Sequence, residues 1–234
     1  MLPFDRYAGN VWRMIEGQWN PATMKIVETA AEQAALEDII ERHKPQVPEE
    51  CRHLNYQFRS PFRYGCYPRA SRFRRPGRTH GVYYAAEHEL TAALESAWGN
   101  VVFYRESPDT PLPRNPTNHT LILAEILAPI AVDLTHPEVA GLGDCTHPTY
   151  YEETCAFAED VRGQGCEAIR YRSARDPSGR TNLAVLSCAA FAQPIPIGSQ
   201  TWRMFLKSDR VLLYNETLTQ THDMIVEDQG FAAG

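Results

Sequence analysis

Segments with the alternating pattern of β-strands outnumber helical segments in this chain, and the two kinds do not alternate regularly. An alternation of strands with helices would favour a doubly wound parallel sheet, whereas this order favours an α+β fold. We therefore predict a mixed, mostly antiparallel sheet. Strand patterns occur at 53–59, 81–85, 120–126, 130–134, 168–171 and 183–186, and 202–206 with 210–214 suggests a final hairpin.

The clearest helical pattern lies near the N-terminus, over residues 22–44. Leu36, Ile39 and Ile40 follow the i, i+3, i+4 spacing of one helical face, and prolines end the pattern directly afterwards. We interpret residues 1–50 as an N-terminal helical extension and residues 51–216 as the main domain. Residues 217–234 are expected to form a partly disordered tail.

An acid-free segment rich in arginine begins the main domain. Residues 51–86 contain eight arginines and neither aspartate nor glutamate, although the whole chain carries a net charge of −6. Aromatic residues are interleaved with these arginines, as in Phe62-Arg63-Tyr64 and Arg72-Phe73-Arg74. Guanidinium groups bind phosphate bidentately, and aromatic rings stack on flat heterocycles. The segment therefore predicts a nucleotide or nucleic-acid site, while the net acidity argues against a general nucleic-acid binder.

The ends, the apolar runs and the cysteines indicate a cytoplasmic protein. The first residues lack the basic start and apolar run of a signal peptide, and no stretch approaches the roughly 20 apolar residues of a spanning helix. We expect free thiols in a reducing compartment and no metal site, because no Cys-x-x-Cys pair occurs. The six cysteines stand at positions 51, 66, 145, 155, 166 and 188.

A helix follows the basic segment and carries a well-placed carboxylate. Its apolar residues Leu90, Ala93, Leu94, Ala97 and Trp98 form one inward face. Glu95 directly follows Leu94 and therefore flanks that face, about 100° round the helix. Neither a Gly-x-Gly-x-x-Gly motif nor a P-loop is present, so a nucleotide would be bound by arginines and aromatic rings instead.

Four motifs in this order resemble the RES-domain family, bacterial toxins of type II toxin–antitoxin pairs that are named for an Arg, a Glu and a Ser. They are the upstream segment 61–64, the run 71–77, the strand and helix start at 82–95, and the run 171–175. The resemblance covers residues 53–215. It implies a fold related to ADP-ribosyltransferases, NAD as co-substrate, and a cognate helix-turn-helix antitoxin that covers the site.

The resemblance implies the catalytic residues Arg72, Glu95 and Ser173. Glu95 would stabilise the cationic ribose that forms when nicotinamide leaves, and Ser173 would orient ribose or amide by a hydrogen bond. Arg72 would neutralise the pyrophosphate. The usual Gly-Arg-Trp-Asn motif is here Ser-Arg-Phe-Arg, which leaves open whether Arg72 or Arg74 faces the site.

Residues that bind NAD are implied by the same resemblance: Arg63, Tyr64, Arg72, Tyr83 and Tyr84. Tyr84 or Tyr64 would stack on nicotinamide, and Arg63 would assist with the pyrophosphate. Because Tyr83 and Tyr84 alternate on a strand, one of them is expected to belong to the core.

The resulting hypothesis is a toxin that consumes NAD, most directly by mono-ADP-ribosylation of a protein such as an enzyme of nucleotide metabolism, and so arrests growth. An alternative is phosphorolysis or hydrolysis that depletes NAD. A non-enzyme alternative is a nucleic-acid binding module built on the arginine and aromatic segment.

Overall fold

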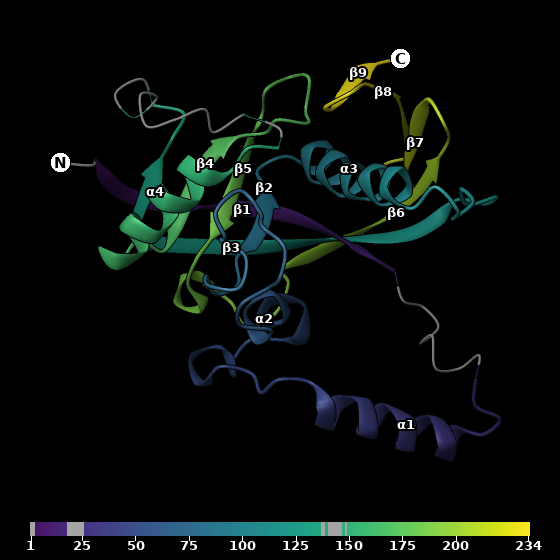
Figure 1. Cartoon of the computed structure of the whole chain (residues 1–234), viewed down its shortest axis with the longest axis horizontal. Coiled ribbons are helices and arrows are strands. Elements are labelled where there is room, and N and C mark those ends of the chain that lie inside the picture. The colour runs from purple at the N-terminus through teal and green to yellow at the C-terminus, as the bar shows by residue number, and fades with distance from the viewer. Residues whose placement is uncertain (1–2, 18–25, 137–138, 140–146, 148) are drawn as a thin grey trace.

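The computed structural model describes residues 3–17, 26–136, 139, 147 and 149–234. Its strands belong to one sheet with the order β1-β2-β5-β4-β3-β6-β7-β8-β9 (Figure 1). The strands are β1 (Phe4–Glu16), β2 (Tyr83–Ala86), β3 (Thr117–Asp133), β4 (Ala168–Arg172), β5 (Thr181–Val185), β6 (Gly198–Leu206), β7 (Arg210–Asn215), β8 (Gln220–Val226) and β9 (Phe231–Ala233).

The strand pairings confirm the predicted α+β class with a mixed, mostly antiparallel sheet. Only β3 and β4 pair in parallel within the part of the chain that the structure describes, whereas the other neighbours are antiparallel. β1 pairs with both β2 and β3, so β1, β2, β5, β4 and β3 form a closed ring of strands. The two segments predicted at 120–126 and 130–134 are parts of the single long strand β3.

Helices and short 3-10 turns connect the strands of this sheet. They are α1 (Ala30–His43), α2 (Tyr56–Arg63), α3 (Glu89–Glu106) and α4 (Glu152–Gly163), with short 3-10 turns η2 (Glu49–Cys51) and η3 (Cys188–Ala190). The predicted helix around residues 90–98 is α3. Its small inward residues Ala92, Ala93 and Ala97 are buried against a core that includes Trp202 and Met204 of β6. Small side chains let the axis of α3 lie close to the sheet. This packing fixes how far the remaining side chains of α3, including Glu95, lie from the sheet.

The predicted N-terminal helical extension over residues 1–50 needs correction, because Phe4–Glu16 is a strand. β1 runs antiparallel to β3 from the pair Phe4 and Val132 to the pair Glu16 and His119. Val11 and Met14 are buried in the sheet. The N-terminal segment is therefore an integral part of the fold.

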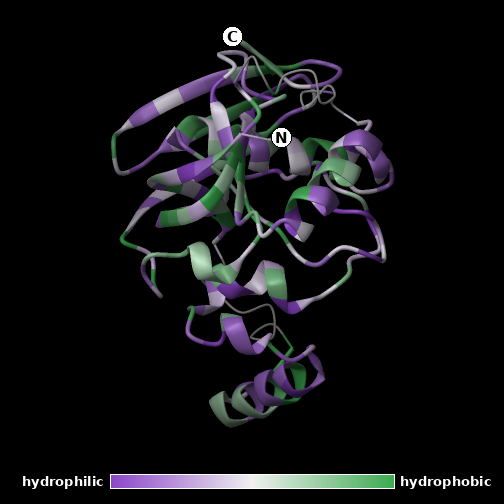
Figure 2. Cartoon of the chain, turned by 90° about the vertical axis from the view of Figure 1, so that its left-hand side faces the viewer, coloured by the Kyte–Doolittle hydropathy of each residue, from purple (hydrophilic) through white to green (hydrophobic). Residues whose placement is uncertain are grey.

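Helix α1 is the part of the predicted extension that is helical. It begins with a capping box, in which the Thr29 hydroxyl accepts from the Glu32 N–H and the Glu32 carboxylate accepts from the Thr29 N–H. None of its residues is buried, and Ile39 and Ile40 are exposed. Figures 1 and 2 show α1 standing apart from the sheet. The start of the predicted helix, residues 22–25, lies outside the described residues.

Residues 53–59 were predicted as a strand, and this prediction is wrong. Asn55 caps helix α2 by accepting hydrogen bonds from the Gln57 and Phe58 N–H groups at 2.9 and 3.2 Å. Phe58 and Phe62, spaced i and i+4, are buried on one face of α2. The alternating pattern of this segment is too short to distinguish a strand from a single buried helix face.

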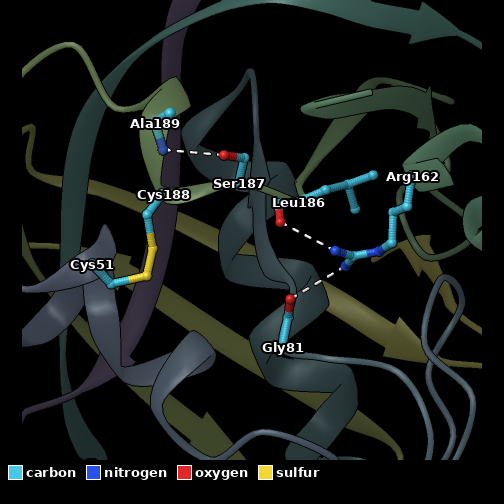
Figure 3. The surroundings of a disulfide bond; sticks show 7 residues. All are labelled: Cys51, Gly81, Arg162, Leu186, Ser187, Cys188 and Ala189. Atoms are coloured by element: carbon cyan, nitrogen blue, oxygen red, sulfur yellow. Dashed lines mark hydrogen bonds between the residues drawn. A yellow bond between two sulfur atoms is a disulfide. The ribbon is translucent and has the colours of Figure 1, made fainter. Parts of the chain in front are cut away.

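The prediction of free thiols is also wrong for one pair of cysteines. Cys51 of η2 and Cys188 of η3 form a disulfide that closes a sequence separation of 137 residues (Figure 3). Cys66, Cys155 and Cys166 are free, and the first of these is exposed. The remaining cysteine, Cys145, lies outside the described residues.

Near this disulfide, Arg162 of α4 forms hydrogen bonds to two backbone segments, one directly after β5 and one shortly before β2. Its guanidinium donates to the Leu186 carbonyl at 3.1 Å and to the Gly81 carbonyl at 3.3 Å (Figure 3). Gly81 also lies tightly against α2, because a Cβ at this position would come within 1.7 Å of the Pro61 carbonyl oxygen. Only glycine fits there, so the approach to β2 is fixed by close packing.

The predicted C-terminal tail at 217–234 is ordered and contains β8 and β9, a hairpin that extends the sheet beyond β7. Phe231 is buried in the same core as α3. Burial of this side chain attaches the C-terminal residues Gly-Phe-Ala-Ala-Gly to the fold. None of the helices within the described residues is both long and apolar enough to cross a membrane.

Candidate active site

A cavity of about 400 Å³ lies where β1, β2 and α3 meet the segments that follow β4 and precede α4. Its volume is in the range of ordinary small-molecule sites. Four charged side chains line it among the described residues: Arg13, Arg72, Glu95 and Arg175. Its aromatic lining consists of Trp12, Tyr84, Trp98, Tyr151 and Tyr171.

Glu95 is held in a fixed orientation by two hydrogen bonds. The Ser173 hydroxyl and the Asn182 side-chain amide each donate to Glu95 Oε1 at 2.6 Å. The three residues come from α3, from the segment after β4 and from β5, so the sheet and the helix together set the geometry. Hydrogen bonds to a charged acceptor are the strong ones, and the carboxylate therefore enters the cavity in one orientation.

Ser173 has a second role at the same place, because its hydroxyl oxygen also organises the chain that follows. The N–H groups of Arg175 and Asp176 both donate to Ser173 Oγ at 3.1 Å. With its acceptor side occupied in this way, the hydroxyl proton points to Glu95. Glu95 and Ser173, both implied as catalytic residues by the family resemblance, are therefore in direct contact.

Arginines that share the cavity with this carboxylate lie with their guanidinium groups on aromatic rings. The Arg72 guanidinium carbon lies 5.2 Å from the Tyr151 ring centroid, and that of Arg175 lies 4.6 Å from the Trp98 ring centroid. Arg72 and Arg175 are both buried. Cation–π contacts of this kind hold a guanidinium in place.

Arg13 of β1 is the third arginine of the cavity. It donates to the Tyr84 carbonyl at 3.3 Å, and its guanidinium carbon lies 4.8 Å from the Tyr83 ring centroid. Burial lowers the pKa of Arg13 and, together with its surroundings, that of Arg175, but arginine stays protonated in proteins. Arg13 thus adds a third guanidinium-bearing residue to the described lining of the cavity.

The structure places Tyr84 and Tyr83 on opposite faces of β2. Tyr84 lines the cavity, and its hydroxyl contacts Ser71 Oγ at 2.9 Å and accepts from the Phe73 N–H at 3.1 Å. Burial raises the pKa of Tyr84, so its hydroxyl stays protonated at neutral pH. Tyr83 is fully buried and packs against Phe58 and Phe191. It supports the wall of the cavity from behind and does not line it.

The structure also distinguishes Arg72 from Arg74. Arg72 lines the cavity, whereas the Arg74 guanidinium lies 4.1 Å from the Tyr67 ring centroid and donates to the Arg69 carbonyl at 3.4 Å. A short reverse turn, in which Ser71 and Arg74 exchange backbone hydrogen bonds at 3.0 Å, points the two side chains in different directions.

Arg63 and Tyr64, predicted to bind NAD, lie outside the cavity. Arg63 donates to the Pro45 carbonyl at 2.6 Å and to the Glu41 carboxylate at 2.7 Å, so its charge is used to attach α1 to α2. Tyr64 ends α2 as an exposed residue near Tyr67. Their assignment to the site needs correction, because α2 turns this part of the basic segment away from β2.

Sequence reasoning missed several residues of the cavity, above all Arg13, Trp98, Arg175 and Asn182. An arginine inside the apolar run Val11–Ile15 was a signal for Arg13, since a charge in a buried strand requires a purpose. Asn182 is buried, and its Oδ1 has no hydrogen-bond partner within the described residues. An unpaired buried acceptor in a cavity wall is a position for a ligand donor. No cluster of His, Cys, Asp and Glu that could hold a metal ion occurs in the described part of the chain.

Comparisons with known proteins place this geometry in a family. One solved structure with a similar fold comes from the crystal structure of the M. tuberculosis MbcT–MbcA toxin–antitoxin complex, with 13% sequence identity, 84% of this chain and 85% of that chain covered, and a TM-score of 0.49. No curated protein matches the chain. The model of the RES domain matches residues 47–207, well over half of the sequence. The chain therefore belongs to the RES domain family.

Proposed function

We propose that this protein is a cytoplasmic toxin of a type II toxin–antitoxin system that cleaves NAD and transfers ADP-ribose to a protein. The observation that carries the proposal is the fixed carboxylate of Glu95 in a cavity whose described lining also contains Arg13, Arg72 and Arg175. Membership of the RES domain family supports the same function. A relation of the fold to ADP-ribosyltransferases stays a prediction.

The charges and donors of the cavity fit NAD. The described lining of the cavity contains three arginines, and guanidinium groups suit the negative charges of a diphosphate. The aromatic walls suit the flat rings at either end of the molecule. Asn182 adds a polar side chain to the cavity wall, where its amide N–H donates to Glu95.

Glu95 would act on the bond between ribose and nicotinamide. When this bond breaks, its electron pair neutralises the departing nicotinamide nitrogen, and positive charge develops on the ribose. A carboxylate already oriented by Ser173 and Asn182 stabilises that charge without reorganising. The acceptor then forms a bond to the same ribose carbon and loses its proton. The arginines would hold the ADP portion throughout, so that only the ribose has to move.

Release of nicotinamide from NAD tests this proposal. Wild-type protein should release nicotinamide in the presence of cell extract, and Glu95→Gln should release far less. Glu106→Gln is a matched control because Glu106 lies on the same helix but is exposed and paired with Arg69 at 3.5 Å. If the wild-type protein is inert with and without phosphate and extract, the enzyme proposal fails.

Phosphorolysis or hydrolysis of NAD is the alternative within the same chemistry. It uses the same carboxylate and the same arginines, and differs only in the acceptor. NAD labelled in its ADP portion separates the two. Transfer gives a labelled protein band in extract, whereas phosphate or water as acceptor gives only small labelled products.

Nucleic-acid binding by the basic segment is the less favoured alternative, because carboxylates from elsewhere in the fold occupy several of its arginines. Arg75 pairs with Glu152 at 2.5 Å and with Glu159 at 3.1 Å, and Arg78 lies 3.6 Å from Glu159. Carboxylates that already neutralise these groups would have to be displaced by phosphates. Binding to DNA or RNA that falls steeply with salt concentration would support this alternative.

A further inference from the structure

The C-terminal hairpin of β8 and β9 lies beyond the residues that the family model matches, yet its turn contacts two arginines. The turn offers three successive carbonyl oxygens. Those of Glu227 and Asp228 accept from the Arg105 guanidinium at 3.0 and 3.1 Å. The third, on Gln229, accepts from the guanidinium of Arg175, an arginine of the cavity.

Both arginines also lie on the same tryptophan. The Trp98 ring centroid is 4.6 Å from the Arg175 guanidinium carbon and 5.3 Å from that of Arg105. Phe231, the first residue of β9, meets the Trp98 ring edge-on with a centroid distance of 5.8 Å. Trp98 and Arg175 line the cavity, whereas Arg105 and Phe231 do not. The described part of the hairpin therefore does not line the cavity itself, but it contacts two residues that do, Trp98 and Arg175.

The turn lies directly against the backbone that carries Arg175. A Cβ placed on Gly230 would lie 3.3 Å from the Ala174 carbonyl oxygen and 3.5 Å from Arg175 Cα. Such close packing fixes the distance between the Gln229 carbonyl and the Arg175 side chain. Figure 1 shows the hairpin near α3, the helix that supplies Trp98 and Arg105.

We propose that the turn Glu227–Gly230 positions Arg175 to bind the diphosphate of the substrate, and that Arg105 is a positioning residue that holds the turn. A free arginine side chain loses rotamer entropy when it binds an anion. Because Arg175 is already ordered by its contacts with Gln229 and Trp98, it loses less entropy when the ligand binds, and the ligand binds more tightly. The identity of the ligand rests on the proposed function, but the role of the turn does not.

Arg105→Gln tests this inference because Arg105 is exposed and lies outside the cavity. The variant should bind ADP-ribose about fivefold more weakly by calorimetry, the effect of about one hydrogen bond's worth of ordering. Its KM for NAD should rise by a similar factor while kcat stays within about twofold, since the chemistry at Glu95 is untouched. Arg203→Gln is the matched control, because Arg203 is an exposed arginine on β6 that pairs with Glu216.

A double-mutant cycle separates positioning from a general effect on stability. If Arg105 acts through Arg175, then Arg105→Gln should have no further effect on ADP-ribose binding in an Arg175→Ala background. An Arg105→Gln effect of equal size in both backgrounds would overturn the inference. So would wild-type affinity in Arg105→Gln itself.

The outcomes distinguish this inference from the proposed function. If the wild-type protein cleaves NAD and Arg105→Gln binds ADP-ribose normally, the inference fails and the proposed function stands. If the wild-type protein binds ADP-ribose without cleaving NAD, and Arg105→Gln binds it more weakly, the proposed function fails and the inference stands. Absence of ADP-ribose binding to the wild-type protein would overturn both.

Discussion

Glu95→Gln is the substitution that isolates the charge of the catalytic carboxylate from its shape. The glutamine carbonyl oxygen can accept the hydrogen bonds that Ser173 and Asn182 now donate to Glu95 Oε1. The cavity keeps its volume and its contacts. Its balance of three arginines against one carboxylate becomes three arginines alone among the described lining residues. Binding of an anion should therefore be maintained or strengthened.

The expected loss of rate follows from the interaction of that charge with the cationic ribose. Two opposite charges about 4 Å apart attract each other by about 4 kcal/mol at an effective dielectric constant of about 20. Because each 1.36 kcal/mol is roughly a factor of ten in rate, kcat should fall by about 10³-fold. The ground-state substrate already carries a positive charge on its nicotinamide ring, so part of this attraction is present before the bond breaks, and about 10²-fold is the lower bound we expect.

Single-turnover release of nicotinamide, read against ADP-ribose affinity from calorimetry, measures both effects. We expect slow release together with affinity at or above that of the wild-type protein, and wild-type behaviour for Glu106→Gln. A Glu95→Gln protein that is folded by thermal unfolding and retains more than about a tenth of the wild-type rate would refute the electrostatic role.

Three further predictions concern stability and orientation. Ser173→Ala should lower kcat by about 10- to 100-fold with little change in KM. It should also lower the free energy of unfolding in urea by about 1–2 kcal/mol, because two N–H groups lose their acceptor. Unchanged kinetics would contradict this prediction. Replacing Cys51 and Cys188 together by Ala should lower the free energy of unfolding by up to about 5 kcal/mol, which is the chain-entropy value for a loop closed across 137 residues. Equal stability of the wild-type protein with and without reductant would contradict this prediction. Burial is the largest influence on Glu87 and opposes its ionisation, but hydrogen bonds from Arg170, Thr181 and Tyr7 and the charge of Arg170 together outweigh it and lower the pKa of Glu87. The stability that Glu87 contributes is therefore complete above the ordinary glutamate pKa and falls as pH drops through the lowered value. An Arg170→Gln protein with the same acid unfolding profile as the wild type would contradict this.

Several elements predicted from local patterns agree with the structure, although residues 53–59 do not form the predicted strand. The apolar face of α3 and the alternating strand β2 are visible over a few residues, and so are β4 and β5. Glu95 and Ser173 came from the family resemblance, and the structure brings them to a 2.6 Å contact.

Features that depend on distant parts of the chain were missed. β1 is a strand because it pairs with β3, more than a hundred residues away, and no local pattern shows this. Arg63 lies outside the predicted site because its position on α2 directs its side chain toward Glu41 and Pro45. The disulfide joins cysteines whose spacing carries no motif. Arg13 and Arg175 were missed for the same reason, since only the assembled fold brings them into the lining of one cavity.

The acid-free arginine segment acquires a different meaning in the folded chain. Of its arginines, Arg72 faces the cavity, whereas Arg63, Arg75 and Arg78 contact carboxylates from α1 and α4. The absence of acids within the segment reflects partners supplied from elsewhere in the fold. Composition alone therefore overestimated the number of arginines available to a ligand.

The most direct test of the proposed site is a crystal structure of Glu95→Gln soaked with NAD, since slow cleavage should preserve the substrate. The account predicts the ribose bonded to nicotinamide beside residue 95 and the diphosphate in contact with Arg72, Arg175 or Arg13. NAD bound elsewhere, or a cavity that stays empty at concentrations well above the wild-type KM, would contradict it.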